Sequence, residues 1–197
     1  TATLVSPHFL FRGELQPEPN NPSVIHPIDE HALASRLSYF LWSSLPDDEL
    51  LQLAGERRLR MPGVLEEQVR RLLRNERARA LVEQFAGQWL QFRNIDGVRP
   101  DLERFPEFDD GLRRSMRRET ELFLEHVVRQ DRSVLEILDA DYTFLDERLA
   151  RFYGVPEVQG PEFRRVDMTR MRRGGGILAH ASLLTVSSYS TRTSPVL

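Results

Sequence analysis

The chain has 197 residues, of which 40% are hydrophobic and 29% are charged, and this balance is typical of a protein that folds around a buried core. All 27 basic residues are arginine and there is no cysteine, which excludes lysine Schiff bases, P-loop lysines, disulfides, thiolate metal ligands and covalently attached haem within these residues. The formal net charge of −3, with acids interleaved among the arginines, argues against a nucleic-acid-binding surface, and no apolar run approaches the roughly 20 residues of a transmembrane segment.

The first 27 residues have the composition of a connector. Prolines are dense between Gln16 and Pro27, and proline both lacks an amide donor and restricts the residue before it. Thr1 is not an initiator methionine, no signal-peptide pattern follows it, and the last residues, Ser194 to Leu197, add no closing helix. We therefore expect the sequence to be an excerpt of a longer protein.

Residues 28–156 predict an all-α domain, an irregular multi-helix bundle with proline-rich connectors. Apolar residues recur there at helical spacing, often after an Asp, Asn or Ser that can cap a helix. We expect Trp42 in the core, and a central helix from Glu76 to Phe92 with Phe85 and Trp89 on its apolar stripe. The expected helices start after Asp29, after Pro46, at Val64, at Glu76, after Asp109, after Ser133 and at Leu145.

The character of the chain changes after Gly154. Residues 157–197 hold six arginines and three acids, so this stretch is positive while the rest is negative, which favours a domain boundary near residue 157. A short extended segment is expected near 163–168, a flexible turn at 174–176, and a helix at Ile177–Val186 that exposes little but serine and histidine. The expected organisation is therefore 1–27, 28–156 and 157–197.

Three polar residues of the helix after Asp109 are candidates for chemistry. Glu121, Glu125 and His126 could supply the acid–base groups of a hydrolase or the ligands of a metal-dependent enzyme. Arg117 and Arg118 precede them on the same helix and favour a solvated face of ion pairs instead. Both hypotheses stay open at the level of the sequence.

Other patterns give weaker predictions. His26 and His31 are five residues apart with a proline between them, a spacing that disfavours a metal site. Asp139 and Asp141 begin like a calcium loop, but the positions that need a glycine and a bidentate carboxylate hold other residues, so a turn between helices is the simpler interpretation. The triple glycine at 174–176, beside two arginines, could present backbone amides to an anion, although the spacing and the lysine of a P-loop are missing.

Several strings, in order along the chain, resemble one family. Those that strongly resemble a planctomycete-type domain of unknown function, number 1592, are SRLSYFLWSS from Ser35, FAGQWL from Phe85, DYTFL from Asp141 and LARFYG from Leu149. Those similar to the opening of the planctomycete cytochrome C domain, domain of unknown function 1588, are RGGGIL from Arg173 and RTSPV from Arg192. SPHFLFR from Ser6 is similar to the tail of the preceding family domain.

In that family, helical modules stand beside c-type haem segments in large extracytoplasmic proteins, and the haem-attachment site lies downstream of the Thr-Ser-Pro-Val string. The resemblance implies that this chain, with no cofactor of its own, is a non-catalytic scaffold of a redox or electron-transfer protein whose partners are its neighbouring domains. It carries over no catalytic residue. If haem docks on this chain, His180, Met168 and Met171 are the candidate axial ligands. The alternatives are the hydrolase above and a protein-interaction module with an exposed apolar patch around Ile177–Val186.

Overall fold

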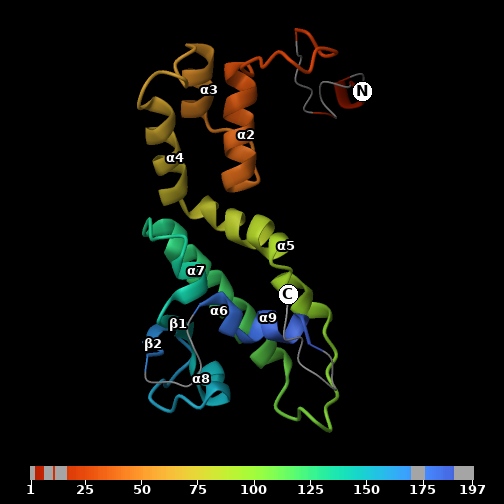
Figure 1. Cartoon of the computed structure of the whole chain (residues 1–197), viewed down its shortest axis with the longest axis vertical. Helices are drawn as coiled ribbons and strands as arrows, with labels where there is room; N and C mark the ends of the chain where they lie inside the picture. The colour runs from red at the N-terminus through yellow and green to blue at the C-terminus, as the bar shows by residue number, and fades with distance from the viewer. Residues whose placement is uncertain (1–2, 7–10, 12–16, 170–175, 189–197) are drawn as a thin grey trace. The chain divides into compact units, whose positions relative to one another are not determined.

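The computed structural model describes residues 3–6, 11, 17–169 and 176–188, and the chain divides into two compact units, Thr1–Leu72 and Leu73–Leu197 (Figure 1). Within the described residues helices predominate and a single two-stranded sheet is present, so the expected mostly α-helical class is confirmed. A 3₁₀ turn, η1, spans Thr3–Val5.

Three helices make up most of the first unit: α2 (Glu30–Trp42), α3 (Asp48–Gly55) and α4 (Val64–Arg74), which runs just past the end of the unit. Asp29 and Asp47 cap α2 and α3, because their carboxylates accept hydrogen bonds from backbone amides of the first turn. The indole of Trp42 is buried, as predicted, and its Nε1 donates to the carbonyl of Leu72 at 2.9 Å. This bond fixes the end of α2 against α4.

The second unit is assembled around one long helix, α6, and its elements follow in chain order. They are η2 (Glu76–Ala78), the π turn η3 (Leu81–Ala86), α5 (Gly87–Trp89), η4 (Phe92–Gly97), α6 (Asp110–Arg129), α7 (Glu136–Asp139), β1 (Tyr142–Leu145), α8 (Glu147–Tyr153), β2 (Arg164–Asp167), η5 (Ile177–Ala179) and α9 (Ala181–Val186). Asp109 caps α6, as the sequence predicts, by accepting from the amide of Leu112 at 2.7 Å.

Helix α6 buries two clusters of apolar side chains along its length. Phe123 and Val127 pack with Phe92 of η4 in one cluster, and Leu112 and Met116 pack in the other. The remaining buried members of the first cluster are Val82, Ala86, Leu124, Ala140, Tyr142, Ile177 and Leu183, and those of the second are Ile95, Leu145, Leu149, Ala150, Val155, Val158 and Ala181. Segments from both ends of the second unit therefore share the core of α6.

The sheet joins two strands, of which the sequence predicts one. The extended segment expected near 163–168 is confirmed as β2, which pairs antiparallel with β1 from Tyr142↔Asp167 to Leu145↔Arg164. Strand β1 was expected to be part turn and part helix, and this is wrong: Leu145 belongs to the strand, and Asp146 caps the helix that follows. The boundary expected near residue 157 stays a prediction, although the strand pairing places β2 in the same unit as β1.

The expected central helix from Glu76 to Phe92 is wrong in its regularity. The chain forms a 3₁₀ turn, a π turn and a short α-helix there, and in a π turn each amide bonds to the carbonyl five residues back instead of four. The wider turn rotates the side chains away from the predicted stripe. Phe85 and Trp89 are consequently 50% and 62% exposed, stacked on each other with ring centroids 6.0 Å apart.

The helix expected at Ile177–Val186 is present as two shorter elements, η5 and α9, and its predicted exposure is wrong. His180 and Ser182 are buried, while Leu178 is exposed. Of the predicted glycine turn and its arginines, only Gly176 lies within the described residues; residues 170–175, with Met171, lie outside them.

Candidate functional site

The carboxylates of Glu121 and Glu125 lie in a cluster of arginines on one side of α6. Arg117 Nε donates to Glu121 at 2.9 Å, and Arg118 Nη1 donates to Glu121 at 3.1 Å and to Glu125 at 3.0 Å. Arg79 adds longer contacts of 3.8 Å to both carboxylates. The predicted ion pairs are confirmed, whereas the predicted solvation is wrong for Glu121, which is 4% exposed.

These pairs keep the cluster ionised. Burial by itself would lower the pKa of the Arg117 guanidinium, but the hydrogen bond and the charge of Glu121 outweigh burial and raise the pKa above its ordinary value. The same balance, with Glu121 and Glu125 as the acids, raises the pKa of Arg118. A carboxylate held by such guanidinium partners is an ionised acceptor, and each proton it gained would weaken the cluster.

His126 is not brought together with the two carboxylates. Its imidazole instead packs against the rings of Tyr142 and Phe144, with centroids 5.4 Å away in both cases. Burial, followed by the nearby charges of Arg165 and Arg132, lowers the pKa of His126 below its ordinary value. The hydrolase hypothesis requires His126 beside Glu121 and Glu125, and the structure places it against aromatic rings.

An open hollow of about 600 Å³ lies over α6 and the start of α8, and its polar groups already have partners. Ser115 at its edge donates to Asp146 Oδ2 at 2.6 Å, and Asp146 Oδ1 accepts from the amide of Leu149 at 2.8 Å to cap α8. Glu121, which also lines the hollow, is held by arginines as described. The acids at this hollow therefore hold elements of the fold together.

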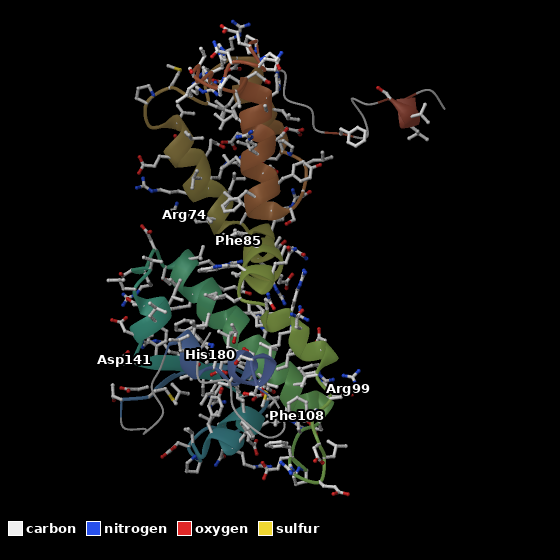
Figure 2. The ribbon with its side chains drawn as sticks, turned by 45° about the vertical axis from the view of Figure 1, so that its right-hand side comes forward. Arg74, Phe85, Arg99, Phe108, Asp141 and His180 are labelled. Atoms are coloured by element: carbon white, nitrogen blue, oxygen red, sulfur yellow. The ribbon has the colours of Figure 1, made fainter. Side chains whose placement is uncertain are left out.

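A second polar group lies on the buried side of α6, and His180 is part of it (Figure 2). At its centre is Glu119, which is 0% exposed. Glu119 Oε1 accepts from the hydroxyl of Thr143 at 2.7 Å, and Oε2 accepts from the hydroxyl of Tyr153 at 2.6 Å. Tyr153 in turn accepts from the backbone amide of Ala181 at 2.8 Å. Helix α6, strand β1, helix α8 and the start of α9 thus meet at one carboxylate.

The imidazole of His180 lies between two threonines. Its Nε2 is 3.4 Å from Thr143 Oγ1, and its Nδ1 is 3.0 Å from Thr120 Oγ1, which is itself 2.6 Å from Ser182 Oγ. The edge of the ring also packs against Phe123, with centroids 4.8 Å apart. Each of these polar residues is at least nine-tenths buried. We name the set Glu119, Thr120, Thr143, Tyr153, His180 and Ser182 the buried polar network.

The sequence analysis identified only His180 of this network, and for a different role. One signal was present: Glu119 and Thr120 fall on the same helical stripe as Met116 and Phe123, where a polar residue implies a buried partner. The partners themselves come from three other elements, and no local pattern connects them to α6.

The candidate haem ligands that the structure describes are both packed inside the second unit. Met168 is buried beside the sheet, and its amide donates to the carbonyl of Asp141 at 2.7 Å. His180 has both ring nitrogens directed at threonine hydroxyls. Met171 lies outside the described residues. Axial ligation by any of the three stays a prediction.

Two searches bear on other kinds of site. Across residues 3–6, 11, 17–169 and 176–188, no group of three or more histidine, aspartate or glutamate side chains is arranged to hold a metal ion. The helices of that same part of the chain include none with the length and apolar character that a bilayer crossing requires.

Comparison with known families agrees with the resemblance of the sequence. A family model described as a protein of unknown function (DUF1592) matches residues 28–155, which is more than half of the chain. Comparisons with curated proteins and with solved structures gave no match. The similarity of the C-terminal strings to a cytochrome-type domain stays a prediction. The chain therefore belongs to the DUF1592 family of proteins of unknown function.

Proposed function

We propose that this chain is a non-catalytic helical scaffold within a larger extracytoplasmic protein, where it holds neighbouring domains that include a c-type haem domain used in electron transfer. The chain contains no cysteine, so the thioether attachment of that haem belongs to a neighbour. The support for a haem-bearing neighbour is the similarity of residues 173–178 and 192–196 to the start of a cytochrome-type domain.

The observation that carries the scaffold role is the engagement of the acids on α6. Glu121 and Glu125 are bound by arginines, and Glu119 accepts hydrogen bonds from two buried hydroxyls. A general acid or base must exchange a proton with a substrate at hydrogen-bond distance. Carboxylates whose oxygens already connect helices and strands support a structural role better than a catalytic one.

The proposal is tested in the longer protein that contains this chain, produced in a host that attaches haem. We expect a Soret band that shifts on reduction with dithionite, and we expect Glu125→Gln to leave the reduction rate and the reduction potential unchanged. Glu66→Gln is the matched control, because Glu66 forms an exposed ion pair with Arg70 at 2.6 Å on a helix of the first unit.

Two results would contradict the proposal. A longer protein without a Soret band would remove the redox role. A loss of turnover in Glu125→Gln that Glu66→Gln does not share, in a protein that still folds, would assign Glu125 to a catalytic site and restore the hydrolase hypothesis.

A further inference from the structure

The segment Gly176–Ser188 is held in the second unit from two sides. Ile177 and Leu183 belong to the apolar cluster of Phe123, whereas Ala181 belongs to the cluster of Met116. The segment therefore passes between the two clusters and crosses α6, although about 50 residues of sequence separate it from the end of that helix.

The start of the segment accepts only glycine. Gly176 has a φ of 72°, in the left-handed region that favours glycine, and a Cβ added there would lie 2.3 Å from the carbonyl oxygen of Leu138. Because that neighbour is backbone, it cannot rotate away. The close approach of the two backbones fixes where the segment begins.

The hydrogen atoms of the buried polar network can be assigned from the acceptors. Glu119 accepts from Thr143 and from Tyr153, so the single hydroxyl proton of Thr143 points to Glu119. Thr143 can then only accept from His180, whose Nε2 must carry a proton. In the neutral imidazole Nδ1 is therefore an acceptor.

The same logic continues to the other end. Thr120 donates its proton to His180 Nδ1, and it therefore accepts from the hydroxyl of Ser182. The donors run in one direction, from Ser182 through Thr120, His180 and Thr143 to Glu119. Each donor has an acceptor in this arrangement, and no buried hydroxyl needs a second proton.

This chain of donors specifies one register for the segment. The polar side chains of His180 and Ser182 alternate with Ala181 and Leu183, which enter the apolar clusters. A shift of the segment by one residue would place an imidazole or a hydroxyl against carbon and leave Thr120 and Thr143 facing methyl groups. Burying polar groups without partners is strongly unfavourable, so such shifts are excluded.

We propose that Gly176–Ser188 is the anchor by which this module holds the polypeptide that follows it, and that the buried polar network, with His180 as its neutral Nε2-protonated tautomer, is the lock that fixes the anchor in one register. The partner is thus the next domain of the same polypeptide, an assignment that rests on the proposed function. The grip itself depends only on residues of the second unit.

Hydrogen exchange of the full chain, measured by mass spectrometry, tests the lock. Thr143→Val keeps the volume and the β-branch of the side chain but removes the hydroxyl that connects His180 to Glu119. We expect amides of 176–188 to exchange about 10- to 100-fold faster, the factor that corresponds to losing a hydrogen bond to a charged group. Thr143→Ser should restore slow exchange, and Ser187→Ala, whose hydroxyl bonds only to carbonyls of its own helix, should change little.

A nitrogen-15 NMR spectrum of the wild-type chain at pH 7 tests the tautomer even if Thr143→Val fails to fold. We expect His180 to show a protonated Nε2 and an unprotonated Nδ1. A protonated Nδ1, or exchange of 176–188 that is as fast in the wild type as in Thr143→Val, would overturn the proposal. Uniformly faster exchange of the whole second unit in Thr143→Val would also overturn it, because the network would then be general core. None of these results involves haem, so they are distinguishable from failure of the proposed function.

Discussion

Replacing Asp146 by alanine should destabilise the second unit more than the loss of an ordinary helix cap. Asp146 is buried and uses both carboxylate oxygens: one caps α8 through the amide of Leu149 at 2.8 Å, and the other accepts from the hydroxyl of Ser115 at 2.6 Å. Asp146→Ala therefore removes a cap and also takes the acceptor away from a buried hydroxyl on α6.

The expected magnitude follows from the two contacts. Loss of an aspartate cap costs about 1 kcal/mol, and a buried hydroxyl deprived of its acceptor costs roughly 1–3 kcal/mol. We expect Asp146→Ala to lower the free energy of unfolding of the second unit by about 2–4 kcal/mol. Asp109→Ala is the matched control, because Asp109 caps α6 in the same way but is exposed and otherwise pairs only with Arg148 at 2.6 Å. Its expected cost is about 1 kcal/mol.

Urea unfolding followed by hydrogen exchange of peptides from Leu73–Leu197 measures the effect for this unit alone. Ser115→Ala in the Asp146→Ala background should add little, because it removes the hydroxyl that had lost its acceptor. The reasoning is refuted if Asp146→Ala costs no more than Asp109→Ala. It is equally refuted if Ser115→Ala is as costly in the double variant as it is alone.

Two further predictions concern the backbone and the pH dependence of stability. Gly176→Ala should cost roughly 2 kcal/mol more than Gly160→Ala in urea unfolding, because both residues have positive φ but only at Gly176 would the new Cβ meet a neighbour, the carbonyl of Leu138; equal costs would contradict this. Burial, and then the hydrogen bond to Glu136, raises the pKa of Tyr142 from 10.0 to about 12, so the folded state favours the neutral phenol. Stability from Tyr142 is therefore complete below pH 10 and is lost as the pH rises towards 12. Urea unfolding across this range should show the decline in the wild type but not in Tyr142→Phe, and an identical decline in both would contradict the assignment.

Features set by neighbouring residues could be predicted from the sequence. The caps at Asp29 and Asp109 are local, since a side chain bonds to amides two or three residues later, and the long apolar stripe of α6 needs no information from elsewhere. The extended segment at β2 was also predicted. Its partner β1 was not, because the pairing connects residues about 20 apart in sequence and the string around Tyr142 has no turn signal of a hairpin.

The candidate site depended on information that the sequence does not hold locally. The ion pairs of Glu121 followed from the helical spacing to Arg117 and Arg118, but their burial did not, because Arg79 and the rest of the unit cover them. The buried polar network draws on α6, β1, α8 and the anchor, so its members look like ordinary polar residues until the fold brings them together. The π turn before α5 likewise shifted Phe85 to the surface without any residue that marks it in advance.

Absorption spectra of two samples from the same haem-attaching host test the central claim most directly: the purified 197-residue chain, and the longer protein that contains it. The account predicts a Soret band from the longer protein and none from the chain by itself. A Soret band from the isolated chain, or its absence from the longer protein, would contradict the account.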